Sequence, residues 1–120
     1  MSEVALLHLV RAAFPGWEVV HQGRPAWLRP QSIDIYIPDA RVGIEYQGEQ
    51  HSKPVERFGG PAAFKRQIER DERKRSLCQQ NQCALIEVYP DYDPEQVISQ
   101  VRTAISTAER GASALPGGAV

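Results

Sequence analysis

The sequence predicts a single α/β domain built around a strand hairpin, and three observations support this. Residues 32–51 have the pattern of two strands with a tight connection between them. Residues 61–80 carry a long helical pattern, and residues 83–89 follow as a short, mostly apolar strand. With helical patterns at 2–14 and 94–109 and one further short strand, the order becomes helix, three strands, helix, strand, helix.

Length and composition are those of one globular domain. The chain of 120 residues is long enough for one hydrophobic core, and its 42% apolar and 24% charged residues are ordinary. We assign residues 1–110 to a single domain and residues 111–120 to a flexible tail. The net charge of −1 excludes a uniformly basic nucleic-acid coat, but many of the 14 Lys and Arg residues fall between Lys53 and Arg75.

Cysteine usage and hydropathy predict a cytoplasmic location. Cys78 and Cys83 are the only cysteines and form no CxxC pair, so they cannot build a four-thiolate zinc site. We expect both to be reduced, half-buried thiols. No apolar run approaches the roughly 20 residues that span a bilayer, and the N-terminus lacks a secretory pattern. We therefore expect no membrane association.

The first helix is predicted over residues 2–14, with Ser2 as its N-cap and Pro15-Gly16 at its end. At about 100° per residue, Glu3 falls on the edge of the apolar face of this helix. It is either a first-turn carboxylate that favours the helix dipole or a participant in a metal site.

A short strand is expected at 17–22, with two valines at its centre. Residues 23–30 form a loop that contains Trp27 and Arg29. These two side chains either contact a partner or cover the core, and the sequence leaves both open.

In the hairpin, polar residues alternate with apolar ones, as in strands that bury one face. Isoleucines at every second position of 33–37 alternate with polar residues that include Asp34, and apolar residues of 42–47 alternate with Glu45 and Gln47. If the apolar sets share a core face, Asp34, Glu45 and Gln47 project together from the opposite face. A strand pair with a solvated outer face has the same pattern.

The continuation of the hairpin favours a functional interpretation. The run GEQH bends the chain at Gly48 and places His51 just past the end of the strand. Residues 52–60 then form a basic and aromatic loop, and Gly59-Gly60 predicts that it is mobile.

The long helix at 61–80 carries charge on its apolar stripe, because Asp71 and Arg75 fall in line with Phe64 and Ile68. A buried carboxylate needs a partner. Asp71 either pairs with Arg75 at the i, i+4 spacing or belongs to a site.

The C-terminal third of the domain is regular. Residues 83–89 read as a strand in the middle of a sheet. Asp93 is an N-cap candidate followed by Pro94, and residues 94–109 form an amphipathic helix.

These polar residues together suit Mg²⁺, which binds one or two carboxylates together with waters and phosphate oxygens. Such an ion lowers the pKa of a bound water and stabilises charge on a phosphate. A histidine at the rim is either a general base or a further ligand. Basic residues nearby either neutralise a nucleic-acid backbone or form a solvated helix face: Lys53, Arg57, Lys65, Arg66, Arg70, Arg73 and Lys74.

The element order and the spacing of Asp34 and Glu45-x-Gln47 resemble the restriction-endonuclease-like, or PD-(D/E)XK, nucleases, whose signature is an Asp followed by Glu-x-Lys on adjacent strands. The continuation to His51 and the run ERDERK, which holds Asp71, resemble the branch of very short patch repair and phage homing endonucleases. The resemblance covers roughly residues 2–90. It implies an αβββαβ core with a C-terminal helix and a mixed central sheet of about four strands.

Carried over by position, the resemblance implies a role for each polar residue. Asp34 would be the central metal ligand with Glu45 beside it, and Glu45 and Gln47 would match the Glu-x-Lys pair. Glu3 would be the helix glutamate, His51 the catalytic histidine and Asp71 the later acid. Gln47 departs from the family lysine, and an amide supplies no positive charge. Either His51 or Lys74 takes that duty, or catalysis is weaker.

The implied function is a Mg²⁺-dependent endonuclease, with Mn²⁺ as a substitute, that hydrolyses phosphodiester bonds of double-stranded DNA in a repair, mobile-element or phage context. The alternatives are a catalytically weak or inactive nucleic-acid-binding module of the same fold, and a structural protein whose hairpin face is solvated. Monomer and homodimer both stay open. The residues expected to bind nucleic acid are Lys53, Arg57, Arg66, Arg70 and Lys74.

Overall fold

The computed structural model describes residues 2–47 and 60–114, and it confirms the α/β class, the order of elements and a mixed four-stranded sheet. The elements are α1 (Glu3–Ala13), β1 (Val20–Gly23), η1 (Ala26–Leu28), β2 (Ile33–Ile37), η2 (Pro38–Ala40), β3 (Val42–Tyr46), α2 (Gly60–Gln80), β4 (Ala84–Val88) and α3 (Pro94–Ala114).

The predicted caps are present at both outer helices. The Ser2 hydroxyl oxygen accepts the N–H of Ala5 at 3.1 Å, and a carboxylate oxygen of Asp93 accepts the N–H of Glu95 at 3.1 Å. These bonds satisfy N–H groups that the first turn of a helix leaves without partners. No helix within residues 2–47 and 60–114 is long and apolar enough to cross a membrane.

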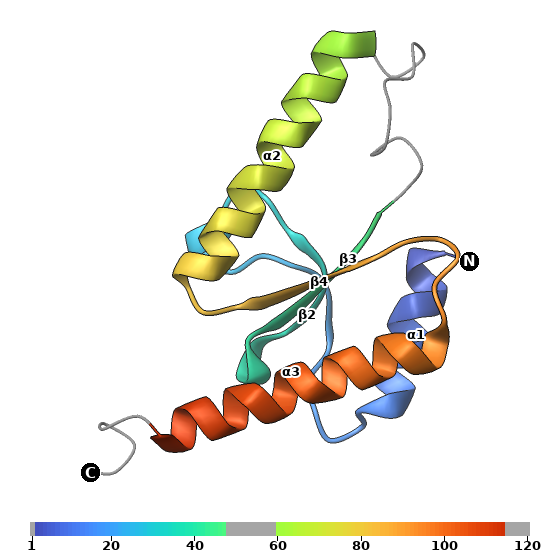
Figure 1. Cartoon of the computed structure of the whole chain (residues 1–120), viewed down its shortest axis with the longest axis vertical. Coiled ribbons are helices and arrows are strands. Elements are labelled where there is room, and N and C mark those ends of the chain that lie inside the picture. Colours follow the sequence, from blue (N-terminus) through green and yellow to red (C-terminus); the bar gives the residue numbers. More distant parts are fainter. Residues whose placement is uncertain (1, 48–59, 115–120) are drawn as a thin grey trace.

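The sheet has the order β1-β2-β3-β4, with the first two pairings antiparallel and β3 parallel to β4. The parallel pairing follows from the connection, because α2 lies in the crossover between β3 and β4. In this register Glu45 lies beside Glu87 of β4. The helices form layers on the sheet, with α2 on one side and α1 and α3 on the other (Figure 1).

Two clusters of buried side chains hold these layers together. The first cluster joins α1 and α3 to the sheet, and Leu6, Ile35 and Val101 lie at its centre with no exposed surface. The second cluster lies under the C-terminal end of α2 and consists of Leu28, Ile33, Cys78 and Cys83. At Gly43, a Cβ atom would lie 3.0 Å from a methyl group of Ile33, so a larger residue would press on the second cluster.

The clusters correct two predictions about burial. Ile33 was expected to share a core face with Ile35 and Ile37, but it belongs to the second cluster. It pairs with Gly23 of β1 but lies before the part of β2 that pairs with β3, which begins at Ile35. The cysteines are free thiols as expected, but they are buried rather than half-buried, with Cys78 only 1% exposed.

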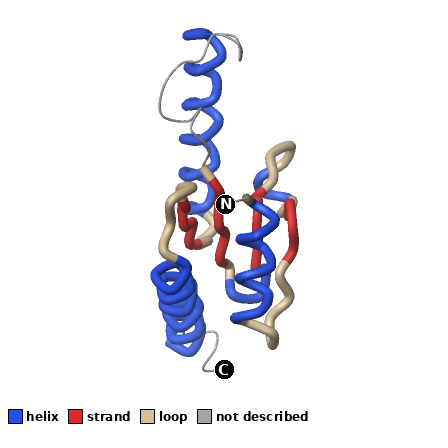
Figure 2. Tube along the Cα trace, turned by 90° about the vertical axis from the view of Figure 1, so that its right-hand side faces the viewer, coloured by secondary structure: helices blue, strands red, loops and turns tan. Residues whose placement is uncertain are grey.

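The N-terminal half of α2 extends beyond the sheet (Figure 2). Its 21 residues reach about 31 Å at 1.5 Å per residue, whereas a strand of five residues reaches about 17 Å. The prediction that Phe64 and Ile68 mark a core-facing stripe is therefore wrong, because Ile68 is 38% exposed and Phe64 is half-buried.

The place of one strand and the boundaries of two elements also differ from the sequence-based expectation. β4 is an edge strand rather than a central one, and its apolar character reflects helices packed over it. β1 begins at Val20, where pairing with Tyr36 begins, instead of at residue 17. α3 continues to Ala114, so the first residues of the expected tail are helical.

Candidate active site

Five of the six predicted catalytic residues line one open cavity of about 440 Å³. The cavity lies between the sheet and α2, and α1 contributes to it as well. Its lining includes Glu3, Asp34, Glu45, Gln47 and Asp71, together with the predicted nucleic-acid-binding residues Arg70 and Lys74. Arg66 is exposed on α2. The remaining predicted residues, His51, Lys53 and Arg57, lie outside the part of the chain that the structure describes.

Asp34 and Glu45 are linked across the two strands by hydrogen bonds to backbone groups. Glu45 Oε2 accepts the N–H of Asp34 at 2.7 Å, and Asp34 Oδ2 accepts the N–H of Tyr46 at 2.9 Å. Each carboxylate therefore accepts a hydrogen bond from a backbone N–H of the opposite strand. These bonds lie at the open end of the hairpin, just beyond the paired residues Ile35 and Ile44. These bonds hold both carboxylates in fixed orientations on the cavity wall.

Lys74 reaches Glu45 from α2. Its Nζ atom lies 2.5 Å from Glu45 Oε1, and the two side chains are only 12% and 11% exposed. A nearly buried ion pair of this kind is retained only when its geometry is good, since both charges have lost water. The structure thus puts the lysine ammonium beside the Glu45-x-Gln47 segment.

The electrostatics of the site disfavour negative charge. Burial is the largest cause of a raised pKa at Asp34, and the charge of Glu3 adds to it, while the Tyr46 N–H and Lys74 oppose it. At Glu45, burial and then the charge of Asp34 raise the pKa, against the opposing effect of Lys74. A cation at this wall would stabilise the ionised form of both carboxylates.

Gln47 is buried, at 5% exposure, and is held from β4. Its Nε2 donates to Glu87 at 3.3 Å, and its backbone N–H donates to the carbonyl of Val88 at 2.7 Å. Glu87 also accepts two hydrogen bonds from Arg75, at 2.5 and 3.0 Å. The Gln47 amide is therefore orientated by a charged pair instead of carrying charge itself.

Arg75 does not make the simple pair with Asp71 that the helical spacing offered. Its ion-pair partner is Glu87, at 2.5 Å, and Asp71 acts on it as a further nearby negative charge that favours the protonated guanidinium and contributes to its raised pKa. Asp71 is half-buried and lines the cavity. Asp71 and Arg75 therefore lie on one face of α2 but have different surroundings. Arg75 pairs with Glu87 of β4, and Asp71 lines the cavity.

Glu3 is held at the cavity edge by β1. Its Oε2 lies 2.7 Å from His21 Nε2 and accepts from Gln22 Nε2 at 2.6 Å. Gln22 Nε2 also lies 3.4 Å from Asp34 Oδ1, and the Ser32 hydroxyl donates to Gln22 Oε1 at 2.8 Å. Sequence reasoning missed His21 and Gln22; the signal for them is the polar VHQG run in a strand next to the hairpin.

Arg73 explains how α2 is positioned. Its guanidinium donates to the carbonyls of Leu28 and Arg29, each at 3.1 Å, and to Gln31 Oε1 at 2.5 Å. Gln31 in turn donates to the carbonyl of Arg70 at 3.0 Å. Since Asp71 and Lys74 lie on the same helix, this clamp fixes the side of the site that α2 supplies.

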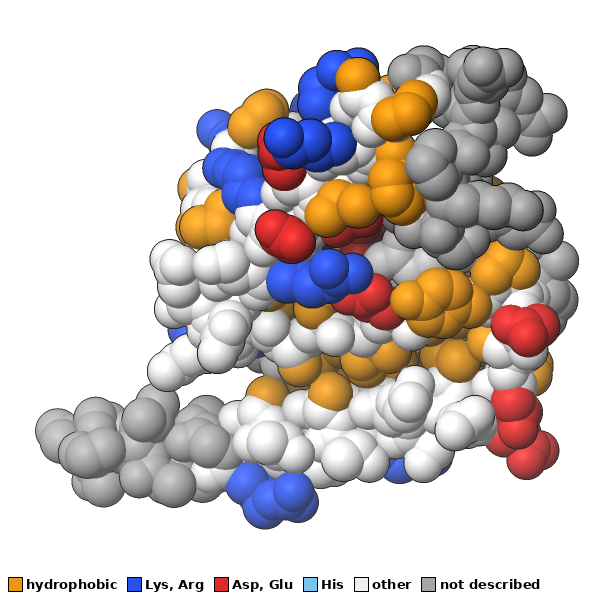
Figure 3. Space-filling model, turned by 45° about the horizontal axis from the view of Figure 1, so that its top comes forward, with side chains coloured by type: hydrophobic (Ala, Val, Ile, Leu, Met, Phe, Trp, Pro, Cys, Tyr) orange, Lys and Arg blue, Asp and Glu red, His pale blue; other side chains and the backbone are white. Residues whose placement is uncertain are grey.

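The donor set fits Mg²⁺ in type. Among the residues that the structure describes, no three acidic, His or Cys side chains are grouped to hold an ion by themselves. Mg²⁺ needs only one or two carboxylates when water and phosphate complete its shell. Asp34 and Glu45 would supply those oxygens, and the contact of Asp34 Oδ1 with Gln22 is long at 3.4 Å. The face drawn in Figure 3 has Asp and Glu side chains beside Lys and Arg side chains.

Comparison with known proteins gives similarity without an activity. The chain is 46% identical over 57 residues to uncharacterized protein 307L of Invertebrate iridescent virus 6, covering 47% of this chain and 29% of that protein. It is 39% identical over 75 residues to uncharacterized protein 094L of Frog virus 3, covering 59% and 48%. The values for uncharacterized protein 033L of Invertebrate iridescent virus 3 are 39% over 75 residues, covering 56% and 38%.

The chain therefore spans less than half the length of each of these viral relatives. No protein-family model matches it.

Proposed function

We propose that this protein is a Mg²⁺-dependent endonuclease with a restriction-endonuclease-like core that hydrolyses phosphodiester bonds of double-stranded DNA. The observation that carries the proposal is the convergence of Glu3, Asp34, Glu45 and Asp71 with Lys74 at one cavity, although they come from α1, the hairpin and α2. A solvated hairpin face gives no reason for such convergence.

Each residue has a role in this proposal. Asp34 and Glu45 would hold Mg²⁺, which supplies an activated water and neutralises charge on the phosphate. Lys74 takes the place of the family's strand lysine, because its ammonium already lies on the Glu45 carboxylate at 2.5 Å. It would stabilise negative charge that develops on the phosphate oxygens. Gln47, whose amide donates to Glu87, would be a neutral hydrogen-bonding group on the cavity wall.

DNA backbone contacts are proposed for the exposed basic residues of α2. Arg66 and Arg70 lie on the part of the helix that extends past the sheet or on the cavity rim. Neutralising phosphates by such residues releases counterions, so binding should weaken as salt rises.

The test is nicking of supercoiled plasmid DNA with Mg²⁺ or Mn²⁺. We expect wild-type protein to nick the plasmid and Asp34→Asn to lose at least about 100-fold of that rate, since an amide cannot replace a charged metal ligand. The variant keeps an oxygen for the Tyr46 N–H, so its fold should persist. Asp91→Asn, an exposed position, is the matched control. Absence of cleavage by the wild type with either ion would refute the enzyme proposal for this chain.

A nucleic-acid-binding module of the same fold is the second candidate. The Lys74–Glu45 ion pair favours it, because this pair neutralises one of the two carboxylates that an ion needs. Calorimetry separates the two candidates. Measurable Mn²⁺ binding that disappears in Asp34→Asn supports the enzyme. Undetectable Mn²⁺ binding, with DNA binding unchanged by that substitution, supports the module.

A further inference from the structure

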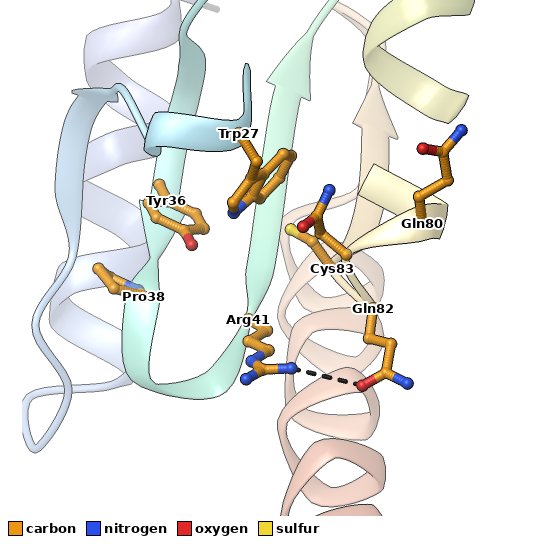
Figure 4. A pocket seen from close by; sticks show the side chains of 8 residues that line it. Trp27, Tyr36, Pro38, Arg41, Gln80, Gln82 and Cys83 are labelled. Carbon is orange, nitrogen blue, oxygen red and sulfur yellow. Dashed lines mark hydrogen bonds between the residues drawn. The ribbon is translucent and has the colours of Figure 1, made fainter. Parts of the chain in front are cut away.

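A second cavity, of about 350 Å³, lies beside the second core cluster, at the end of the hairpin where β2 turns into β3. This volume falls within the range of small-molecule sites. The cavity shares none of its lining residues with the acidic cavity around Asp34. It is bordered by η1, the β2–β3 turn and the segment that follows α2 (Figure 4).

The walls combine aromatic rings with hydrogen-bonding groups. Trp27 and Tyr36 are both half-buried and face this cavity, so each offers part of a ring surface to a ligand. Gln80 and Gln82 bring amides, which carry donors and acceptors together, and Arg41 brings a guanidinium. Figure 4 shows these side chains arranged around one space.

The backbone at this cavity takes a left-handed conformation on two sides. Arg41 has a φ of 54° and Gln82 a φ of 58°, which is the left-handed region where glycine or asparagine is the low-cost residue. The chain instead has two long polar side chains there, and both line the cavity. They contact one another at 3.4 Å, between Arg41 Nη1 and Gln82 Oε1. Both residues end helical turns, Arg41 after η2 and Gln82 after α2, where a left-handed residue is common.

We propose that this cavity binds a nucleobase that carries a phosphate. The flat ring would stack on Trp27, and its hydrogen-bonding edge would meet the amide of Gln82 or Gln80. The phosphate would meet Arg41, whose guanidinium matches phosphate oxygens in two parallel hydrogen bonds. The same chemistry is present in a free nucleotide and in a nucleotide of a single strand. The proposal does not depend on the nuclease proposal, since no residue is shared.

The experiment uses the full chain in EDTA, so that no metal-dependent cleavage intervenes. The four nucleoside 5′-monophosphates are titrated in the Trp17→Phe background, where Trp27 is the remaining tryptophan of the two in the chain. We expect saturable quenching by at least one of them. In calorimetry, Trp27→Leu should weaken binding about tenfold through lost stacking, and Trp27→Phe should stay within about threefold. Circular dichroism checks that both variants are folded.

The phosphate contact has its own pair of variants. Arg41→Gln should weaken the monophosphate but leave the corresponding nucleoside unchanged, and Arg24→Gln, at an exposed position, should change neither. Tight binding of a mononucleotide would identify the ligand as a free nucleotide. Binding only of a short single-stranded oligonucleotide assigns a base within a strand. No saturable binding of either up to roughly 10 mM, or full binding by folded Trp27→Leu, would overturn the proposal.

Discussion

At the residue scale, the Lys74–Glu45 ion pair joins α2 to the hairpin at the cavity. Both side chains are about nine-tenths removed from water, so loss of either partner leaves a nearly buried charge. Such losses cost about 3–5 kcal/mol, whereas removal of both charges together costs much less. The pair also holds the ammonium against the carboxylate that the proposed ion requires.

We predict that Lys74→Met and Glu45→Gln each lower the free energy of unfolding by about 3 kcal/mol. The double variant should be more stable than the sum of the two losses predicts, because the uncompensated charge is gone. Urea denaturation of the four proteins measures this cycle. Additive losses would mean that the 2.5 Å contact contributes no coupling.

Asp34 has the opposite character, since its own burial makes its charge unfavourable. Its pKa lies above the ordinary value of 3.8, so the folded state binds this proton more readily than the unfolded state. Its contribution to stability is therefore greatest below pH 3.8 and falls as the pH rises through the raised pKa. Ionisation of Asp34 in the folded state therefore comes at a cost in stability, as is common at functional sites.

We predict that Asp34→Asn raises the melting temperature at pH 7 in EDTA, even though it abolishes metal-dependent activity. The gain should shrink as the pH is lowered toward 3.8, where the wild-type carboxyl becomes neutral as well. Thermal unfolding from pH 7 to pH 3.5 measures the difference, with Asp91→Asn as the control. A melting temperature that is lower than wild type at pH 7 would contradict this prediction.

At the scale of elements, the position of α2 over the hairpin is set by contacts in its C-terminal half. It packs on the sheet only through its C-terminal end, and the Arg73 guanidinium ties it to the loop after η1. Asp71 and Lys74 flank Arg73 on the same helix. Their position over the hairpin therefore depends on contacts made by a residue that does not itself line the cavity.

We predict that Arg73→Ala lowers stability by about 2 kcal/mol and lowers cleavage as well, because hydrogen bonds from a charged donor are lost. Arg73→Lys should fail to restore either property, since an ammonium cannot donate to two carbonyls in the same fork. Arg66→Ala, on an exposed position of the same helix, should leave stability unchanged and weaken DNA binding. Equal effects of the two alanine variants on stability would contradict the clamp.

At the scale of the whole molecule, the two faces of the sheet differ in what packs against them. The first cluster contains most of the buried apolar side chains and joins α1 and α3 to the sheet. The α2 side has a smaller cluster, with the acidic cavity and the second cavity next to it. Stability thus comes mainly from one face, and the polar groups are gathered on the other.

We predict that hydrogen exchange follows this division. Amides of β3 should be protected close to the limit of global unfolding, because β3 lies between two strands and under the first cluster. Amides of residues 61–70 should exchange much faster, since this half of α2 extends past the sheet. Mass spectrometry on peptic peptides resolves the two segments. Equal protection would show that α2 has support along its whole length.

Much of the fold could be predicted from the sequence because it depends on neighbours in the chain. The helix caps at Ser2 and Asp93 and the alternation around Asp34 and Glu45 are local patterns. The stripe of Phe64 and Ile68 failed for a global reason: no strand in the described part of the chain is long enough to lie beneath that half of α2.

The sequence by itself determined the α/β order of elements and placed carboxylates and an amide on one side of a hairpin, since strand periodicity relates them directly. Only the tertiary structure decided which side chains contact them. Lys74 lies on Glu45, Gln22 bridges Glu3 to Asp34, and Glu87 holds Gln47, each between different elements. Such contacts depend on how a helix packs over a sheet, and no local pattern encodes that geometry.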